Sequence, residues 1–125
     1  MTDKNSNDTK EQASSAKLPM HLIPPAAAWL CLALESGAIK YGAYNWRLLD
    51  GRRLNMTTYI AAAQRHLAAL LDGEDTDPES GLPHAAHVMA GMAIMLDARA
   101  AGTLEDDRPP AGFFSAMAPA LRAAE

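Results

Sequence analysis

The segment spanning residues 74–87 holds the side chains of this sequence that are best suited to chemistry. Four acidic residues precede two histidines that lie three positions apart: Glu74, Asp75, Asp77, Glu79, His84 and His87. Carboxylate oxygens favour hard divalent ions such as Mg²⁺ and Mn²⁺, and imidazole nitrogens widen the choice to Zn²⁺ and Fe²⁺. The segment is therefore a candidate metal site. A solvated acidic loop in front of an ordinary helix explains the same residues without chemistry.

Glu35 is a second candidate because it is the only charged residue between Ala26 and Ile39. That stretch is apolar on nearly every side, which predicts a helix buried on most of its faces. A buried carboxylate needs a cation or strong hydrogen-bond donors, or else it takes up a proton. Glu35 is thus expected on an inward face, as a functional carboxylate or as half of a structural ion pair.

Residues 40–47 combine aromatic, amide and cationic side chains in one short loop. The candidates there are Lys40, Tyr41, Asn45, Trp46 and Arg47. Aromatic faces stack on bases, while lysine and arginine neutralise phosphate charge. The loop therefore suits a nucleotide, although aromatic residues also serve as core or interface anchors.

Arg65 and His66 are further candidates on a helix expected from Thr57 to Leu71. His66 falls on the apolar stripe of that helix, where a histidine is more often a hydrogen-bonded core residue than a ligand. We expect His66 to contact a substrate or to support a ligand, and Arg65 to be a phosphate candidate.

The elements that must position these residues are helices. Abundant Ala, Leu and Met, with only 6% aromatic residues and no Val or Ile runs, predict an all-α fold. Helices are expected from the Pro24-Pro25 pair to Gly37, from Thr57 to Leu71 and from Leu82 to Arg99. Residues 1–16 are predicted to be a disordered arm and residues 17–101 the folded domain. Within that domain, residues 17–25 should be an extended segment laid against the core. Residues 102–125 are predicted to be a linker and a short C-terminal helix.

Composition excludes several classes of protein. The chain has 125 residues and a net charge of −4, which gives no electrostatic reason to bind a nucleic acid polymer or an anionic membrane. One cysteine, Cys31, forms no internal disulfide, and no apolar stretch is long enough for a membrane span. We expect a cytoplasmic protein whose small core is completed in a homo-oligomer, a dimer or a tetramer.

Several short motifs recur in a familiar order. They are Leu18-Pro19, residues 22–25, residues 35–42, Asn45-Trp46-Arg47, residues 65–67, Gly73-Glu74, residues 77–82 and residues 84–87. Over about residues 17 to 97, their order and spacing resemble the phage dATP/dGTP pyrophosphohydrolase family. That family is similar to the MazG-like, all-α NTP pyrophosphatases, which oligomerise and bind Mg²⁺ or Mn²⁺ through carboxylates on helices.

The resemblance implies a small helical bundle that hydrolyses dATP and dGTP to the monophosphate and pyrophosphate. In a phage, such an enzyme would remodel the nucleotide pool of the host cytoplasm. This sequence departs from the wider MazG pattern of Glu-x-x-Glu and Glu-x-x-Asp. Ala38 stands three residues after Glu35, and His84 and His87 stand where the second acidic pair is expected.

The implied hydrolysis leads to a hypothesis for the role of each candidate residue. Two or more Mg²⁺ or Mn²⁺ ions would be held by Glu35, Glu74, Asp77, Glu79, His84 and His87. Glu35 or Glu79 would orient or deprotonate the attacking water. The phosphates would meet Lys40, Arg47 and Arg65. The purine would lie against Tyr41, Asn45 and Trp46 or against the segment from Leu18 to Ile23. His66 would be a further substrate contact.

Two alternatives come from other classes. An HD-type triphosphohydrolase is also all-α and uses His and Asp, but the chain contains no adjacent His-Asp pair. A helical protein that only binds a partner would use the same apolar surfaces and would turn over no nucleotide.

Overall fold

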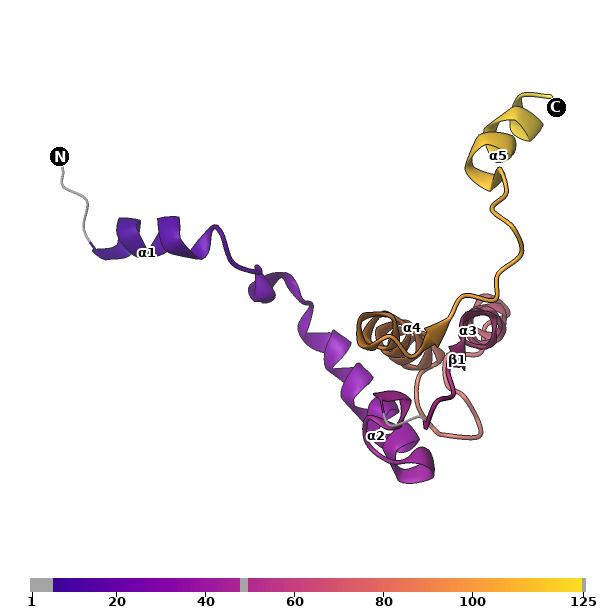
Figure 1. Cartoon of the computed structure of the whole chain (residues 1–125), viewed down its shortest axis with the longest axis horizontal. Coiled ribbons are helices and arrows are strands. Elements are labelled where there is room, and N and C mark those ends of the chain that lie inside the picture. Colours follow the sequence, from indigo (N-terminus) through magenta and orange to yellow (C-terminus); the bar gives the residue numbers. More distant parts are fainter. Residues whose placement is uncertain (1–5, 48–49, 125) are drawn as a thin grey trace.

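Three helices form the centre of the molecule in a computed structural model, which describes residues 6–47 and 50–124. They are α2 (Trp29–Tyr41), α3 (Met56–Leu71) and α4 (His84–Ala101). Helix α4 packs against both α2 and α3 (Figure 1). The predicted all-α fold is confirmed.

Helices α3 and α4 lie close to their predicted positions. Helix α3 ends just before Gly73, whose φ of 94° only glycine adopts without strain. Pro83 precedes the first turn of α4, and Gly102 follows its last turn in the left-handed conformation. The end of α3 at Leu71 is as expected, whereas α4 begins and ends two residues later than the expected Leu82 and Arg99.

Helix α2 begins and ends later than the sequence suggested. A 3₁₀ turn, η2 (Pro25–Ala28), leads into α2, which continues through Gly37 and ends at Tyr41. Gly42 terminates it with a φ of 94°. Gly37 interrupts nothing because a glycine only weakens a helix, whereas the turn after Tyr41 needs a positive φ.

The segment before α2 also differs from expectation. It contains one 3₁₀ turn, η1 (Met20–Leu22), and does not lie against the core, since Leu18 is 81% exposed and Leu22 is 69% exposed. Its large apolar residues are all more than half exposed in the part of the chain that the structure describes.

The core is built from small side chains. Ala33, Ala86 and Ala90 are buried where α2 meets α4, and partly buried larger residues pack around them: Leu30, Leu34, Leu82 and Met89. Among the described residues no large side chain is fully buried. Alanine at the contacts lets the helices approach closely and leaves room beside them for cavities.

A two-stranded parallel sheet, which the sequence did not predict, joins distant parts of the chain. Strand β1 (Leu54–Asn55) pairs with β2 (Leu104–Glu105), so that Leu54 lies opposite Leu104. Just beyond it, Asp107 accepts hydrogen bonds from the amide and the hydroxyl of Thr57 at 2.8 and 2.5 Å. The segment after α4 thereby fixes the start of α3.

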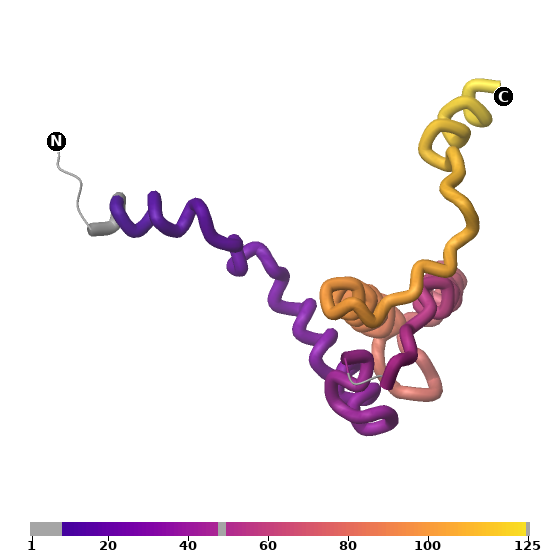
Figure 2. The backbone as a smooth tube through the Cα atoms, in the orientation of Figure 1, coloured from indigo at the N-terminus to yellow at the C-terminus, as the bar shows by residue number. Residues whose placement is uncertain are grey.

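Two terminal helices extend away from the centre toward opposite ends of the molecule (Figures 1 and 2). They are α1 (Ser6–Ser14) and α5 (Phe114–Ala123). The short C-terminal helix was expected. Helix α1 replaces the expected disordered arm over residues 6–14, because Lys, Glu, Gln and Ala at residues 10–13 are good helix formers. None of the helices in the described part of the chain is long and apolar enough to cross a membrane.

Candidate functional site

The loop between α3 and α4 is closed by its own hydrogen bonds. The Asp77 amide donates to the Leu82 carbonyl at 2.9 Å, and the Gly81 amide donates to the Asp77 carbonyl at 2.8 Å. The Asp77 carboxylate also accepts the Glu79 amide at 3.0 Å. Gly81 allows this turn because its φ is 75°. The loop therefore presents its polar residues in one fixed arrangement.

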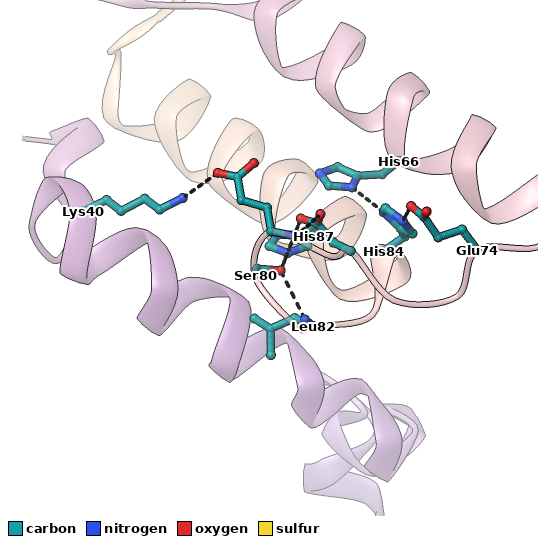
Figure 3. A network of polar contacts seen from close by, with 9 residues as sticks. Lys40, His66, Glu74, Ser80, Leu82, His84 and His87 are labelled. Carbon is teal, nitrogen blue, oxygen red and sulfur yellow. Dashed lines mark hydrogen bonds and ion pairs between the residues drawn. The ribbon is translucent and has the colours of Figure 1, made fainter.

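A chain of hydrogen bonds runs from Glu74 through His84 to His66 (Figure 3). The His84 Nε2 atom lies 2.7 Å from Glu74 Oε1, and the Nδ1 atoms of His84 and His66 are 2.8 Å apart. A carboxylate only accepts, so His84 Nε2 carries a proton. With neutral rings, His66 then donates from Nδ1 and keeps a lone pair on Nε2. His84 is 4% exposed, and both of its nitrogens are engaged.

His87 belongs to a second group in the same cluster. Its Nε2 lies 2.6 Å from the Ser80 hydroxyl and 3.5 Å from the Asp77 carboxylate, to which Ser80 itself donates at 3.2 Å. The His87 ring is stacked on the His66 ring, with centroids 4.7 Å apart and planes 9° apart. We call these six residues the histidine cluster: His66, Glu74, Asp77, Ser80, His84 and His87.

Burial and charge set the protonation of this cluster. Partial burial lowers the pKa of His66, and the neighbouring His87 and His84 lower it further. Burial raises the pKa of Asp77, but hydrogen bonds from the Glu79 amide and the Ser80 hydroxyl outweigh it and hold that pKa below its usual value. At neutral pH the cluster therefore combines a neutral imidazole with an ionised carboxylate.

Three adjoining cavities surround the C-terminal half of α2. One of about 320 Å³ lies between the helices and is lined by Lys40, Tyr41, His66 and His87, among others. A smaller one of about 280 Å³ is lined by Glu35, Lys40 and Ser80 together with apolar residues such as Leu82. Lys40 reaches from α2 toward the acidic loop, where its Nζ lies 3.8 Å from Glu79 (Figure 3). The histidine cluster thus opens onto concave surface.

The largest cavity of these three, of about 560 Å³, lies on the other side of Glu35. Its walls are mostly apolar and include Tyr41, Tyr44, Asn45, Trp46 and Tyr59. This volume is within the usual range for small-molecule sites. Glu35 and Tyr41 each border this cavity and one of the other two.

The aromatic loop, residues 42–47, forms one wall of this largest cavity and is tied to α4. It ends in a 3₁₀ turn, η3 (Asn45–Arg47). Asp97 accepts the Trp46 indole N–H at 2.6 Å and two N–H groups of Arg47, each at 2.7 Å. The hydrogen bonds from Arg47 and then from Trp46 lower the pKa of Asp97 to about 2.

The predicted site residues fall into two sets. Those of the histidine cluster come together, as do Lys40, Tyr41, Asn45 and Trp46 around the cavities. Glu35 is exposed, not buried as expected, because α2 packs against α4 on one side and Glu35 lies outside that contact. Arg47 is committed to Asp97, and Arg65 is exposed on α3 outside the lining of these three cavities.

The predicted metal ligands do not converge within a single chain. Among the residues that the structure describes, no three His, Cys, Asp or Glu side chains are arranged to hold a metal ion. Glu74 and His84 bond each other, and Asp77 bonds the backbone and Ser80. The metal site stays a prediction.

Sequence reasoning missed Asp97 and Ser80. Asp97 did leave a signal, since it is the only acidic residue between His84 and Ala101 in an otherwise largely apolar helix. Ser80 left none, because a serine in a polar loop needs no partner.

Comparison with known proteins points to one family. Residues 7–108 match the family described as dATP/dGTP diphosphohydrolase, N-terminal. The chain is 34% identical over 107 residues to a dATP/dGTP diphosphohydrolase of Salmonella phage PMBT28. That match covers 85% of this chain but only about a third of the phage protein (34%). No solved structure matches the chain. The chain belongs to the dATP/dGTP diphosphohydrolase family and corresponds to its N-terminal region.

Proposed function

We propose that this chain hydrolyses dATP and dGTP to the deoxynucleoside monophosphate and pyrophosphate. The observation that carries the proposal is that a cavity with aromatic walls adjoins, across Glu35, a smaller cavity that Lys40 and Ser80 border. A purine needs a flat, apolar slot, and a triphosphate needs cations and polar groups. Family membership and the name of the phage relative support the same substrates.

In this proposal the base lies in the largest cavity and the triphosphate points toward Lys40. Tyr41, Asn45 and Trp46 frame the purine. Lys40 is half exposed and only loosely paired with Glu79, so an incoming phosphate can replace that carboxylate. Water attacks the α-phosphorus, the bond to the bridging oxygen breaks, and pyrophosphate leaves. Glu35 or Glu79 orients or deprotonates the water.

Mg²⁺ or Mn²⁺ is part of the proposal. Glu35 and Glu79 are exposed carboxylates beside the cavities that Lys40 borders, and Mg²⁺ is commonly held by one or two carboxylates together with substrate phosphates. These two residues would hold the ion, which supplies positive charge for the phosphoryl oxygens and the leaving pyrophosphate. Glu74, Asp77, His84 and His87 would support the site through the histidine cluster. The number of ions proposed is two or more.

Assembly and biological role complete the proposal. Trp29, Leu32 and Ile39 are exposed along α2, and burying such residues between copies of the chain would enlarge a thin core. We therefore propose a homo-oligomer, which light scattering coupled to gel filtration would detect as a multiple of 13.3 kDa. In a phage-infected cell the activity would remodel the purine deoxynucleotide pool.

The test is incubation of the purified chain with each dNTP and Mg²⁺ or Mn²⁺, followed by chromatographic identification of the products. The proposal predicts dAMP or dGMP with pyrophosphate, and little product from dCTP or dTTP. Nucleoside with triphosphate would instead support the HD-type alternative. Absence of turnover with every nucleotide and metal would support a protein that only binds a partner.

A further inference from the structure

Asp97 is the feature of the fold that neither the sequence motifs nor the proposed chemistry uses. It projects from α4 and is the acceptor of three hydrogen bonds, one from Trp46 and two from Arg47. Its side chain is 31% exposed and lines the largest cavity. One carboxylate therefore holds two neighbouring side chains of the aromatic loop.

The aromatic loop needs such a tether because its conformation is costly. Tyr44 has a φ of 55°, the only positive φ of a non-glycine residue in the described part of the chain. A side chain in this region is strained, so surrounding contacts must enforce it. Arg47 lies over the Tyr44 ring at 4.8 Å, and the Tyr44 and Trp46 rings are 5.3 Å apart.

The geometry of the tether is specific to a carboxylate and a guanidinium. The Nε and Nη2 atoms of Arg47 each donate to a different Asp97 oxygen, and the Trp46 indole shares one of those oxygens. An asparagine would turn an N–H group toward the Arg47 donors, and a lysine could not make two parallel bonds. The orientation of Trp46 thus depends on this one pair.

We propose that Asp97 is a specificity-determining positioning residue, which holds Trp46 and Tyr44 as the wall of a slot for a purine base. The inference rests on the proposed hydrolysis of purine nucleotides. Asp97 acts through Trp46 and Arg47 and not on the reacting phosphate, so its loss weakens recognition of the base and leaves the chemical step intact. Purine nucleotides lose more binding affinity than pyrimidine nucleotides, because a larger ring gains more from stacking on an aromatic wall.

The experiment compares Asp97→Asn with Asp106→Asn in a Trp29→Phe background, where Trp46 is the sole tryptophan. Asp106 is a matched control because Arg108 also donates two bonds to it, at 2.8 and 2.7 Å, and its pKa is also about 2. That pair borders another cavity, formed by residues 106 and 108–112.

Two readouts are taken from each variant. Without nucleotide, Asp97→Asn should make Trp46 more accessible to acrylamide, while Asp106→Asn leaves it unchanged. With Mg²⁺, Asp97→Asn should raise KM for dATP and dGTP about tenfold, with kcat changed less than about threefold. Arg47→Lys should shift both readouts in the same direction.

Each other outcome overturns the inference in a recognisable way. Unchanged Trp46 accessibility would show that Asp97 does not tether the loop. Increased accessibility without a change in KM would make Asp97 merely structural. A fall in kcat with constant KM would place it in the chemical step. If the unmodified chain turned over no nucleotide, the proposed function itself would fail, and the specificity role with it, whatever the fluorescence showed.

Discussion

The histidine cluster and the aromatic loop border the same group of cavities but are held in place by different means. In the cluster, hydrogen bonds link side chains from α3, α4 and the loop between them, and His84 is almost completely buried. The aromatic loop is exposed at Tyr44 and is fixed through Asp97.

This difference indicates that the two regions contribute differently to stability and to recognition of the substrate. Buried polar groups that satisfy one another are costly to disturb, so the cluster is expected to contribute to stability as well as to the site. An exposed loop with one tether can be disturbed at little cost to the fold. We therefore expect substitutions in the cluster to lower stability and substitutions in the loop to change recognition.

The largest expected effect lies between the two regions, at the proposed catalytic carboxylates. Glu35→Gln and Glu79→Gln should each lower kcat by about a hundredfold or more, because they remove charge that is used in the transition state. Circular dichroism should be unchanged, since both residues are exposed. Glu105→Gln, on β2, serves as control. Full activity in either variant would remove that residue from the site.

A clear difference in stability is expected for His84→Ala. It leaves a cavity and removes a partner from both Glu74 and His66, which should lower the free energy of unfolding by about 1–3 kcal/mol. Urea unfolding measures this. His21→Ala, the same change at an exposed histidine, should cost less than about 0.5 kcal/mol. Equal losses would refute the idea that the cluster is a stabilising unit.

The two regions should also respond to acid in different pH ranges. The folded-state pKa of His66 is below its unfolded value of 6.5, so the unfolded chain binds a proton first. The stability that His66 contributes is complete above pH 6.5 and is lost as pH falls toward the folded-state pKa. Unfolding in EDTA should show a smaller loss from pH 7.5 to about 5.5 for His66→Gln than for the unmodified chain.

The tether of the aromatic loop should survive that acidification. The pKa of Asp97 falls from 3.8 to about 2 in the folded chain, so its contribution is present above pH 3.8 and is lost as pH falls through about 2. In Trp29→Phe protein, Trp46 should stay shielded from acrylamide at about pH 5. Release of Trp46 together with titration of the histidines would show that the two regions are coupled.

The smallest effect is expected outside both regions. Removal of residues 112–125 should leave the melting temperature within about 2 °C and kcat unchanged, because Phe113 and Phe114 are exposed and α5 extends away from the centre. Differential scanning calorimetry and a dGTP assay measure this. A marked loss of either would mean that α5 covers a surface of another copy of the chain.

The sequence predicted those parts of the fold that depend on local signals. Helices α3 and α4 follow from apolar periodicity with Gly73, Pro83 and Gly102 at their ends. The pairing of β1 with β2 could not be predicted from the sequence. Strands of two residues show no alternation of apolar and polar side chains, and the paired residues lie 50 positions apart in the sequence.

The candidate site was predictable to a similar extent. Residue types identified the histidines and the aromatic loop, but not which atoms bond each other. The Asp97 contacts span about 50 residues and depend on how α4 packs, which no short motif encodes. The inward position expected for Glu35 assumed cover on every side of α2, and a single chain provides it on one.

Photo-crosslinking with 8-azido-dATP tests most directly the claim that the aromatic loop receives the base. Trypsin releases residues 41–47 as one peptide, because Lys40 and Arg47 flank it. The account predicts that this peptide carries the label, that dGTP competes and that dCTP does not. Label confined to the peptide of residues 100–122, which contains the residues that line the cavity near Arg108, would contradict it.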